Sequence, residues 1–339
     1  GPQGDEAVEI VQAAERAGYD SVWAAESYGS DAVSVLAYLA AKTETIQLGA
    51  AILQVPARPP AAAAMAGATI DKLSGGRFIF GFGPSGPQVS EGWYGVPYAK
   101  PWGRTREYVE VVRAIIAREG PLEHQGEHYQ LPLPGGEGKA LKLNFHPQRN
   151  RIPIFLGAIG RKSVELAAEV ADGWIPIFFS VEAFEDTWGE HIAAGLAKGG
   201  RQRSELEVSP SLQVAIDGDV ETARGVVKAG LLLYFGGMGS RKTNFYVDLA
   251  HRFGFGEVAD EVQRLYQDGD REAAYNAITD EVADATSLIG TEAQVSERLE
   301  RFRSAGVDRL IVSPVHLDPG QRLHTIERLA TIAEVGAPA

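Results

Sequence analysis

The 339-residue sequence contains no cysteine, which excludes disulfides, thiolate metal sites, iron–sulfur clusters and cysteine nucleophiles. It is also short of basic residues, because 32 Lys and Arg stand against 45 Asp and Glu and leave a formal net charge of −13. Such an acidic protein repels polyanions, so we expect no nucleic-acid partner. No apolar run approaches the roughly 20 residues that cross a bilayer, and the chain opens without a basic and then apolar leader pattern. We therefore expect a soluble, cytoplasmic protein with no membrane partner.

Short apolar runs alternate with segments of helical periodicity along most of the chain. The seven runs are 21–25, 46–53, 77–83, 152–157, 173–177, 206–216 and 309–315. Alternation of this kind indicates parallel strands joined by crossover helices. Two long excursions, at about 84–150 and 217–288, interrupt the alternation.

Seven strands are one fewer than a (β/α)8 barrel contains. The chain opens inside its first helical pattern, so we expect the absent strand to be the first one. We predict an α/β fold: a single TIM-type barrel domain over residues 1–339 that lacks the N-terminal first strand and carries both excursions as insertions. The edge of the run 21–25 would then be unpaired. An open doubly wound sheet is the alternative, and it needs no missing strand.

The segment from Gly81 to Gly86 follows a strand and matches the G-x-G-x-x-G dinucleotide pattern. Its context argues against a Rossmann site, since Pro84 and Pro87 remove backbone donors and no strand ending in an acid follows about 20 residues on. We interpret the segment as a glycine-rich loop at the mouth of a barrel, where the backbone approaches a planar ligand. A plain turn is the alternative.

A second glycine-rich segment, Gly157-Ala158-Ile159-Gly160-Arg161-Lys162, ends one strand and opens a helix. The N–H groups at a helix N-terminus, with two cations beside them, form a site suited to a phosphate. The alternative is an ordinary strand-to-helix turn with charges at the surface.

Polar and aromatic residues at other strand ends are candidates for catalysis and substrate binding. Glu26 and Ser27 follow the run 21–25, a position that is often catalytic in barrels, so we predict Glu26 as a proton donor or acceptor and Ser27 as a hydrogen-bond donor. A salt bridge from Glu26 to the next unit is an equal alternative. His316 ends the last strand. Trp93 and Tyr94 lie in an aromatic-rich loop that would wall a substrate pocket or form a small satellite core.

No other motif supplies the chemistry. His124 and His128 lie four residues apart, but no third ligand is evident and we expect no metal site. There is no nucleophile elbow, Walker loop or paired-carboxylate motif. A glycine-lined mouth with an anion site favours a phosphorylated cofactor that carries out the difficult chemistry itself.

Four segments give the sequence a family resemblance. They are Ala17-Gly18-Tyr19-Asp20-Ser21-Val22-Trp23, Leu73-Ser74-Gly75-Gly76-Arg77-Phe78, Gly86-Pro87-Gln88-Val89-Ser90-Glu91-Gly92-Trp93-Tyr94-Gly95 and Ala168-Glu169-Val170-Ala171-Asp172-Gly173-Trp174. Through them the chain resembles the luciferase-like monooxygenase superfamily, and within it the coenzyme F420-dependent oxidoreductases of actinobacterial type. The likeness extends from the first helix to the last strand.

The resemblance implies a barrel that binds a deazaflavin at its C-terminal mouth and transfers a hydride at the ring carbon. It places a non-proline cis peptide at Ala51–Ile52, the ring against the backbone of Gly83, Pro84 and Ser85, and the phosphate at Ile159, Gly160 and Arg161. Sugar-phosphate dehydrogenases of this family carry an Asp-His pair where this chain has Glu26-Ser27, so their histidine role does not transfer.

We therefore predict an F420-dependent oxidoreductase that acts on a small organic substrate, works as a homodimer, and lines its substrate pocket with Trp93, Tyr94 and His316. One alternative is an FMN-dependent monooxygenase of the same superfamily. Another is a non-catalytic carrier of deazaflavin or flavin.

Overall fold

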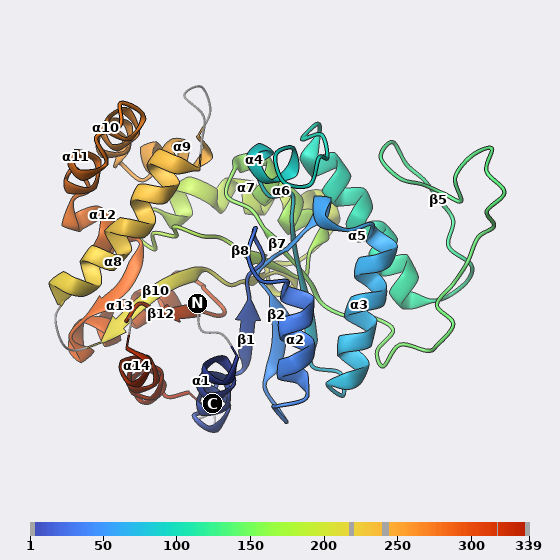
Figure 1. Ribbon diagram of the computed structural model, residues 1–339, viewed down its shortest axis with the longest axis horizontal. Coiled ribbons are helices and arrows are strands. Elements are labelled where there is room, and N and C mark those ends of the chain that lie inside the picture. The colour runs from blue at the N-terminus through green and yellow to red at the C-terminus, as the bar shows by residue number, and fades with distance from the viewer. Residues whose placement is uncertain (1–3, 217–219, 239–243, 317, 336–339) are drawn as a thin grey trace.

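A curled sheet of parallel strands surrounded by helices forms the centre of the computed structural model, which describes residues 4–216, 220–238, 244–316 and 318–335 (Figure 1). The main sheet has the spatial order β1 (Ser21–Ala24), β2 (Gln47–Ala50), β4 (Phe78–Gly83), β7 (Ile154–Gly157), β8 (Gly173–Ile175) and β9 (Glu207–Val208), all parallel. The two-residue β3 (Leu53–Gln54) also pairs with β4. These strands occupy the predicted apolar runs.

The sheet continues through β10 (Ser211–Ile216), which follows β9 after two residues. A bridge between Ile177 and Ser211 joins β10 to the end of β8. Parallel partners flank β10: β11 (Ser287–Gly290) on one edge and β12 (Ile311–Pro314) on the other. The ring order is therefore that of a TIM-type barrel, and the predicted fold class is confirmed.

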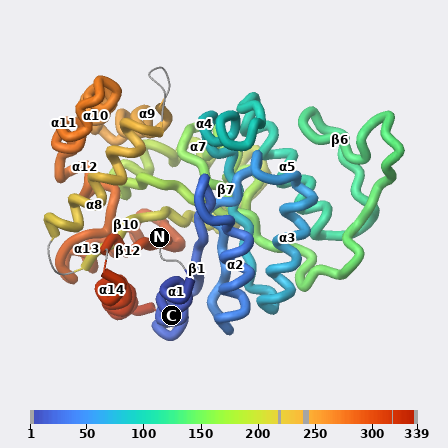
Figure 2. The backbone as a smooth tube through the Cα atoms, in the orientation of Figure 1, coloured from blue at the N-terminus to red at the C-terminus, as the bar shows by residue number. Residues whose placement is uncertain are grey.

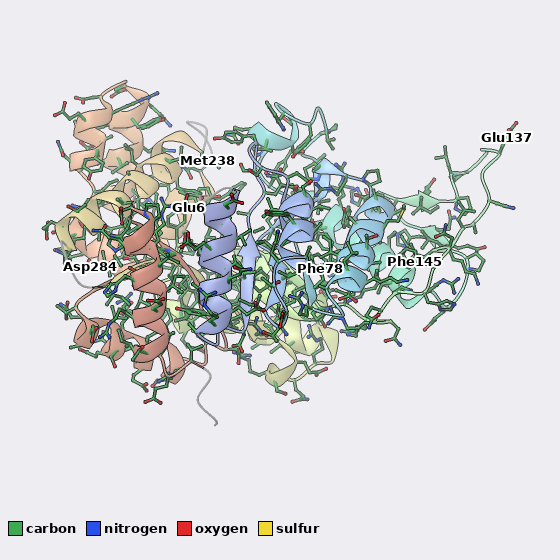
Figure 3. All side chains as sticks on the ribbon, turned by 60° about the horizontal axis from the view of Figure 1, so that its bottom comes forward. Glu6, Phe78, Glu137, Phe145, Met238 and Asp284 are labelled. Carbon is green, nitrogen blue, oxygen red and sulfur yellow. The ribbon has the colours of Figure 1, made fainter. Side chains whose placement is uncertain are left out.

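Helices cover the outside of the curled sheet. Those of the barrel are α1 (Asp5–Arg16), α2 (Ala32–Ala40), α3 (Pro60–Leu73), α5 (Pro101–Ala117), α6 (Arg161–Val170), α7 (Glu190–Gly199), α13 (Glu292–Ser304) and α14 (Pro319–Ile332). The second insertion adds α8 (Val220–Leu232), α9 (Phe245–Arg252), α10 (Gly256–Gln267), α11 (Arg271–Asn276) and α12 (Asp280–Ala285). The first insertion contains α4 (Pro87–Ser90) and a hairpin of β5 (His124–Gln125) and β6 (Gln130–Leu131), and Glu137 lies near the far end of its projecting loop (Figure 3).

The ring has an open position between β12 and β1. In the described part of the chain, β1 pairs only with β2, and β12 pairs only with β10. All four residues of β1 are half-buried, whereas the last three residues of β2 are buried. This exposure is what an unpaired edge produces, so the predicted free edge beside the first strand is confirmed. The division into a single domain stays a prediction.

Contacts between helices and between side chains bridge the open position between β12 and β1. Helices α1 and α14 lie side by side (Figure 2). The Tyr19 hydroxyl donates to the Ile326 carbonyl oxygen over 2.9 Å, and Arg322 of α14 pairs with Glu6 of α1. Beneath them, Arg309 beside β12 donates to the Ser21 hydroxyl over 2.7 Å and pairs with Glu207 at 2.6 Å. The two ends of the open ring are thus tied by side chains.

Removal of the Arg309 guanidinium tests this tie. We expect Arg309→Ala to lower the free energy of unfolding by about 1.5–3 kcal/mol, since hydrogen bonds to a charged group are lost from a side chain that is only 18% exposed. The urea midpoint, followed by tryptophan fluorescence, measures the change. Arg264→Ala removes an exposed arginine with two acidic partners and should leave the midpoint where it is. Equal midpoints for both variants would contradict the role given to Arg309.

Candidate active site

Segments that follow β1, β2 and β4 meet at the carboxyl end of the sheet. The main-chain N–H of Gln54 donates to Glu26 Oε2 over 3.1 Å, and its side-chain Nε2 donates to Ser85 Oγ over 3.0 Å. The Tyr98 hydroxyl donates to the Ser85 carbonyl oxygen over 3.1 Å. The structure therefore brings the predicted residues Glu26 and Ser85 into one network, through a glutamine that sequence reasoning missed.

The floor of this region is the side chain of Ile52. A Cβ added to Gly83 would lie 2.5 Å from Ile52 Cδ1, and one added to Gly157 would lie 3.0 Å from Ile52 Cγ2. Ile52 therefore packs closely against the glycines that end β4 and β7 and leaves little room there for a side chain. The Ala51–Ile52 peptide is cis, as the resemblance implied, and this prediction is confirmed.

Glu26 is buried and fully engaged. Its carboxylate accepts from Arg58 Nη1 over 3.0 Å and from Arg58 Nη2 over 2.7 Å, in addition to the N–H of Gln54. Burial lowers the pKa of Arg58, but the hydrogen bond and charge of Glu26 outweigh it, so that pKa is raised and the guanidinium stays charged. The salt bridge from Glu26 to the next unit, which the sequence left as an equal alternative, is what the structure shows. Ser27 is exposed.

The predicted phosphate loop is held by donors from three other elements. Trp174 Nε1 donates to the Ala158 carbonyl oxygen over 2.8 Å. The Ile159 carbonyl oxygen accepts from Trp188 Nε1 and from Arg252 Nη2, each over 3.0 Å. These bonds fix the loop so that it ends at Gly160, the N-cap residue just before α6. No side chain caps α6, which leaves the first N–H groups of the helix available to a ligand.

A hollow of about 350 Å³ adjoins the start of α6. It is lined by Arg161, Asp186, Thr187, Glu190, His191 and Arg252. Within the described residues, Arg252 Nη1 and Thr187 Oγ1 are buried without a hydrogen-bond partner. Burial and the neighbouring Arg161 lower the pKa of Arg252. Arg161 and Arg252, together with the unused donors of Arg252 and Thr187, suit an anion at the start of α6, while Asp186 and Glu190 line the rest of the hollow.

Sequence reasoning missed Arg252 and Thr187 because nothing local marks them. Arg252 ends α9 in the second insertion, and Thr187 lies in a π-helical segment (Glu185–Gly189) ahead of α7. Only the packing of both segments against the Gly157–Arg161 turn reveals their position.

The three predicted substrate residues differ in their exposure to solvent. Tyr94 is half-buried, and its pKa is raised by burial and by the charge of Glu26, against the opposing effect of Arg58. Trp93 is 65% exposed. His316 is half-buried, and its carbonyl oxygen accepts from Arg322 Nε over 2.6 Å. A pocket role for these three residues stays a prediction.

Among the described residues, no group of three His, Asp or Glu side chains could hold a metal ion.

A neutral replacement of Glu26 tests whether its ion pair with Arg58 stabilises the fold. Glu26→Gln leaves the Arg58 guanidinium with only the more distant and more exposed carboxylate of Asp31, and we expect the free energy of unfolding to fall by about 3 kcal/mol. Urea denaturation measures this, with the exposed Glu257→Gln as the control that should not change. Wild-type stability in Glu26→Gln would show that the pair does not hold this end of the fold together.

Comparisons with known proteins agree with this architecture. A Mycobacterium tuberculosis protein whose name proposes a coenzyme F420-dependent oxidoreductase is 45% identical over 311 residues, which cover 90% of this chain and 89% of that protein. A 5,10-methylenetetrahydromethanopterin reductase of Archaeoglobus fulgidus is 32% identical over 323 residues, which cover 93% of this chain and 92% of the relative.

Solved structures and a family model extend the likeness. The coenzyme F420-dependent tetrahydromethanopterin reductase from Methanopyrus kandleri matches with a TM-score of 0.81 and 25% identity, covering 97% of this chain and 95% of that one. An F420-dependent secondary alcohol dehydrogenase shares the fold at a TM-score of 0.78 and 16% identity, covering 99% of this chain and 96% of the other. The model of the luciferase-like monooxygenase family matches residues 1–309. The chain therefore belongs to the luciferase-like monooxygenase family, as its sequence motifs indicated.

Proposed function

We propose that this protein is an oxidoreductase that binds coenzyme F420 at the carboxyl end of its strands and moves a hydride between it and a small organic substrate. Relatives that match about nine-tenths of the chain carry F420-dependent or reductase names. The observation that carries the proposal is the anion site at Gly160, where an uncapped helix start meets an arginine with an unused donor.

The residues present fit such a cofactor at both of its ends. At the phosphate end, Arg252 Nη1 and Thr187 Oγ1 are buried and unpartnered beside the start of α6. At the ring end, Gln54 is 4% exposed and its Oε1 has no partner. In either orientation of its amide, one end of Gln54 binds Ser85 and the other remains for a heterocycle that carries both N–H and C=O groups. Buried polar groups without partners are rare in native proteins, and the position of these three at the two ends of the proposed site supports the proposal.

The chain's own residues would bind and orient the cofactor. The amides that begin α6 and the guanidinium of Arg252 would hold the phosphate, while Ile52 would support the ring from below. The backbone of Gly83, Pro84 and Ser85 would line the ring. When bound, the deazaflavin supplies the hydride-transfer chemistry. Glu26 and Arg58 would form a neutralised wall that fixes Gln54, a positioning role in place of the predicted proton transfer.

Two alternative functions are each supported by one observation. The phosphate site would serve FMN as well as F420, which keeps an FMN-dependent monooxygenase open. The engagement of Glu26 with Arg58 removes a free carboxylate from the mouth, which favours a non-catalytic carrier. Turnover of bound reduced cofactor with carbonyl compounds distinguishes an enzyme from a carrier.

The predicted homodimer and cytoplasmic location also remain proposals. In the part of the chain that the structure describes, no helix is both long and apolar enough to span a membrane.

Two substitutions of one glycine test the phosphate site. A Cβ at Gly160 would lie 3.4 Å from Ser163 Oγ, and its φ of −82° suits any residue, so Gly160→Ala should retain the fold and most of the affinity. Gly160→Asp places a carboxylate where the phosphate would lie, and like-charge repulsion should abolish binding. Fluorescence titration with F420 and with FMN, separately, gives the dissociation constants, and we expect wild-type binding of F420 at about micromolar or better.

Wild-type affinity in Gly160→Asp would refute the phosphate site. Binding of FMN with no binding of F420 would replace the proposed cofactor, and binding of neither would remove the proposed function altogether.

A further inference from the structure

Three aromatic rings from distant parts of the chain pack together beyond the end of β8. The ring centroids of Phe178 and Tyr234 are 4.5 Å apart, those of Tyr234 and Tyr246 are 4.8 Å apart, and those of Phe178 and Tyr246 are 5.5 Å apart. Each pair is nearly perpendicular, the edge-to-face geometry that aromatic rings prefer. Both tyrosines come from the second insertion, so this aromatic cluster joins the insertion to the barrel mouth.

The backbone of Phe178 is specialised for this position. Its φ is +51°, in the left-handed region that residues other than glycine seldom adopt. The next residue, Phe179, is fully buried against Trp188, with ring centroids 5.6 Å apart. The turn thus sends one phenylalanine into the core and the other into the cluster. A strained residue of this kind at the end of a barrel strand points to a functional constraint.

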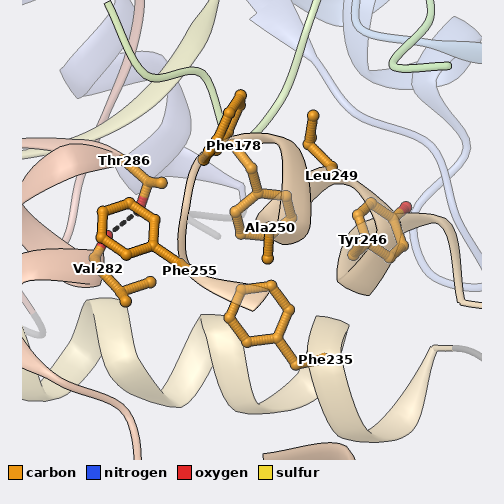
Figure 4. A pocket seen from close by; sticks show the side chains of 9 residues that line it. Phe178, Phe235, Tyr246, Leu249, Ala250, Phe255, Val282 and Thr286 are labelled. Atoms are coloured by element: carbon orange, nitrogen blue, oxygen red, sulfur yellow. Dashed lines mark hydrogen bonds between the residues drawn. The ribbon is translucent and has the colours of Figure 1, made fainter. Parts of the chain in front are cut away.

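The cluster has a closed side and an open side. Its closed side borders an apolar cavity of only about 10 Å³, too small to take a ligand (Figure 4). The Tyr246 hydroxyl points away from that cavity. Neither the Tyr246 nor the Tyr234 hydroxyl has a hydrogen-bond partner among the described residues, and neither is sealed off from solvent. Both phenols are therefore free to bind a ligand on the open side.

The cluster lies at the same end of the barrel as the proposed cofactor-binding loop. Phe178 follows β8 and Ser85 follows β4, and the carboxyl ends of these parallel strands lie at one edge of the sheet. Burial raises the pKa of Tyr246. Because its pKa is raised, the Tyr246 phenol stays protonated and can donate at neutral pH.

The surroundings set the charge and shape of what fits there. Glu26 and Arg58, the buried ion pair of this mouth, neutralise each other. The aromatic cluster adds ring edges and faces together with neutral hydroxyl groups. A flat, uncharged molecule with one hydrogen-bond acceptor matches such a surface.

We propose that Phe178, Tyr234 and Tyr246 form the substrate subsite, and that it takes a planar, uncharged carbonyl compound whose oxygen accepts a hydrogen bond from Tyr246. This proposal rests on the proposed function, because the carbonyl carbon must face the cofactor ring. Phe178 and Tyr234 supply the aromatic walls, and Tyr246 orients the oxygen. The subsite thereby selects against phosphorylated sugars.

Ligand binding without turnover tests the proposal. The protein is first titrated with F420, and acetophenone is then titrated into the complex with oxidised F420, with cofactor fluorescence as the readout. Tyr246→Phe should weaken acetophenone binding about tenfold, the effect of one lost hydrogen bond, with F420 affinity unchanged. Phe178→Gly keeps the left-handed backbone, removes a wall, and should weaken acetophenone binding about fivefold.

The matched control is Tyr275→Phe, which removes a phenol hydroxyl elsewhere in the insertion, one that donates to the Gly225 carbonyl oxygen. It should leave acetophenone binding unchanged, and glucose 6-phosphate should not bind the wild-type complex. Equal acetophenone affinity in wild type and Tyr246→Phe overturns the proposal, as does tighter binding of glucose 6-phosphate or a wild-type complex that binds no acetophenone. Failure of the first titration, with F420 and then with FMN, instead removes the proposed function itself.

Discussion

The position of Ile52 between two strand ends without side chains is the constraint on which the rest of the site depends. Its methyl and methylene groups occupy the space where side chains at Gly83 and Gly157 would lie. This contact fixes the floor of the mouth and places the loops after β4 and β7 around it. A planar ligand above Ile52 would then meet the Ser85 network on one side and the Gly160 turn on the other.

The two sides of the mouth are stabilised differently. On the side proposed for the cofactor ring, a buried ion pair maintains the geometry. Arg58 pairs with Glu26, and Glu26 accepts a hydrogen bond from the main-chain N–H of Gln54. On the phosphate side, Trp188 and Arg252 hold the carbonyl oxygen of Ile159 while the helix start remains uncapped. Donors bind the carbonyl oxygens of Ala158 and Ile159, and no side chain caps the N–H groups that begin α6. The turn therefore offers hydrogen-bond donors to an anion.

The fold was largely predictable from the sequence because its signal repeats. Seven apolar runs separated by helical segments gave the seven strand positions of the ring, and the edge expected to be unpaired has no strand partner among the residues that the structure describes. The short β11 and the hairpin of β5 and β6 were missed. The two-residue strands of the hairpin carry too little periodicity to be recognised. Strand β11 is flanked closely by helices, so a run such as Ser287–Gly290 reads as a connection.

The site was predictable only where a motif lies in continuous sequence. The glycine turns and the Ala51–Ile52 bond were located because consecutive residues and a family resemblance mark them. Arg58, Arg252 and Tyr246 were not located, because the role of each depends on a contact with a segment far away in the chain. Glu26 illustrates the same difficulty. Its place at a strand end suggested a catalytic role, but the sequence did not show that its ion-pair partner, Arg58, lies 32 residues later.

The most direct test of the central claim is a crystal structure of this protein with F420. The account predicts the phosphate at the amides that begin α6 with Arg252 against it, and the ring above Ile52 with its edge toward Gln54. A cofactor bound at the opposite end of the strands, or in the open position between β12 and β1, would contradict it.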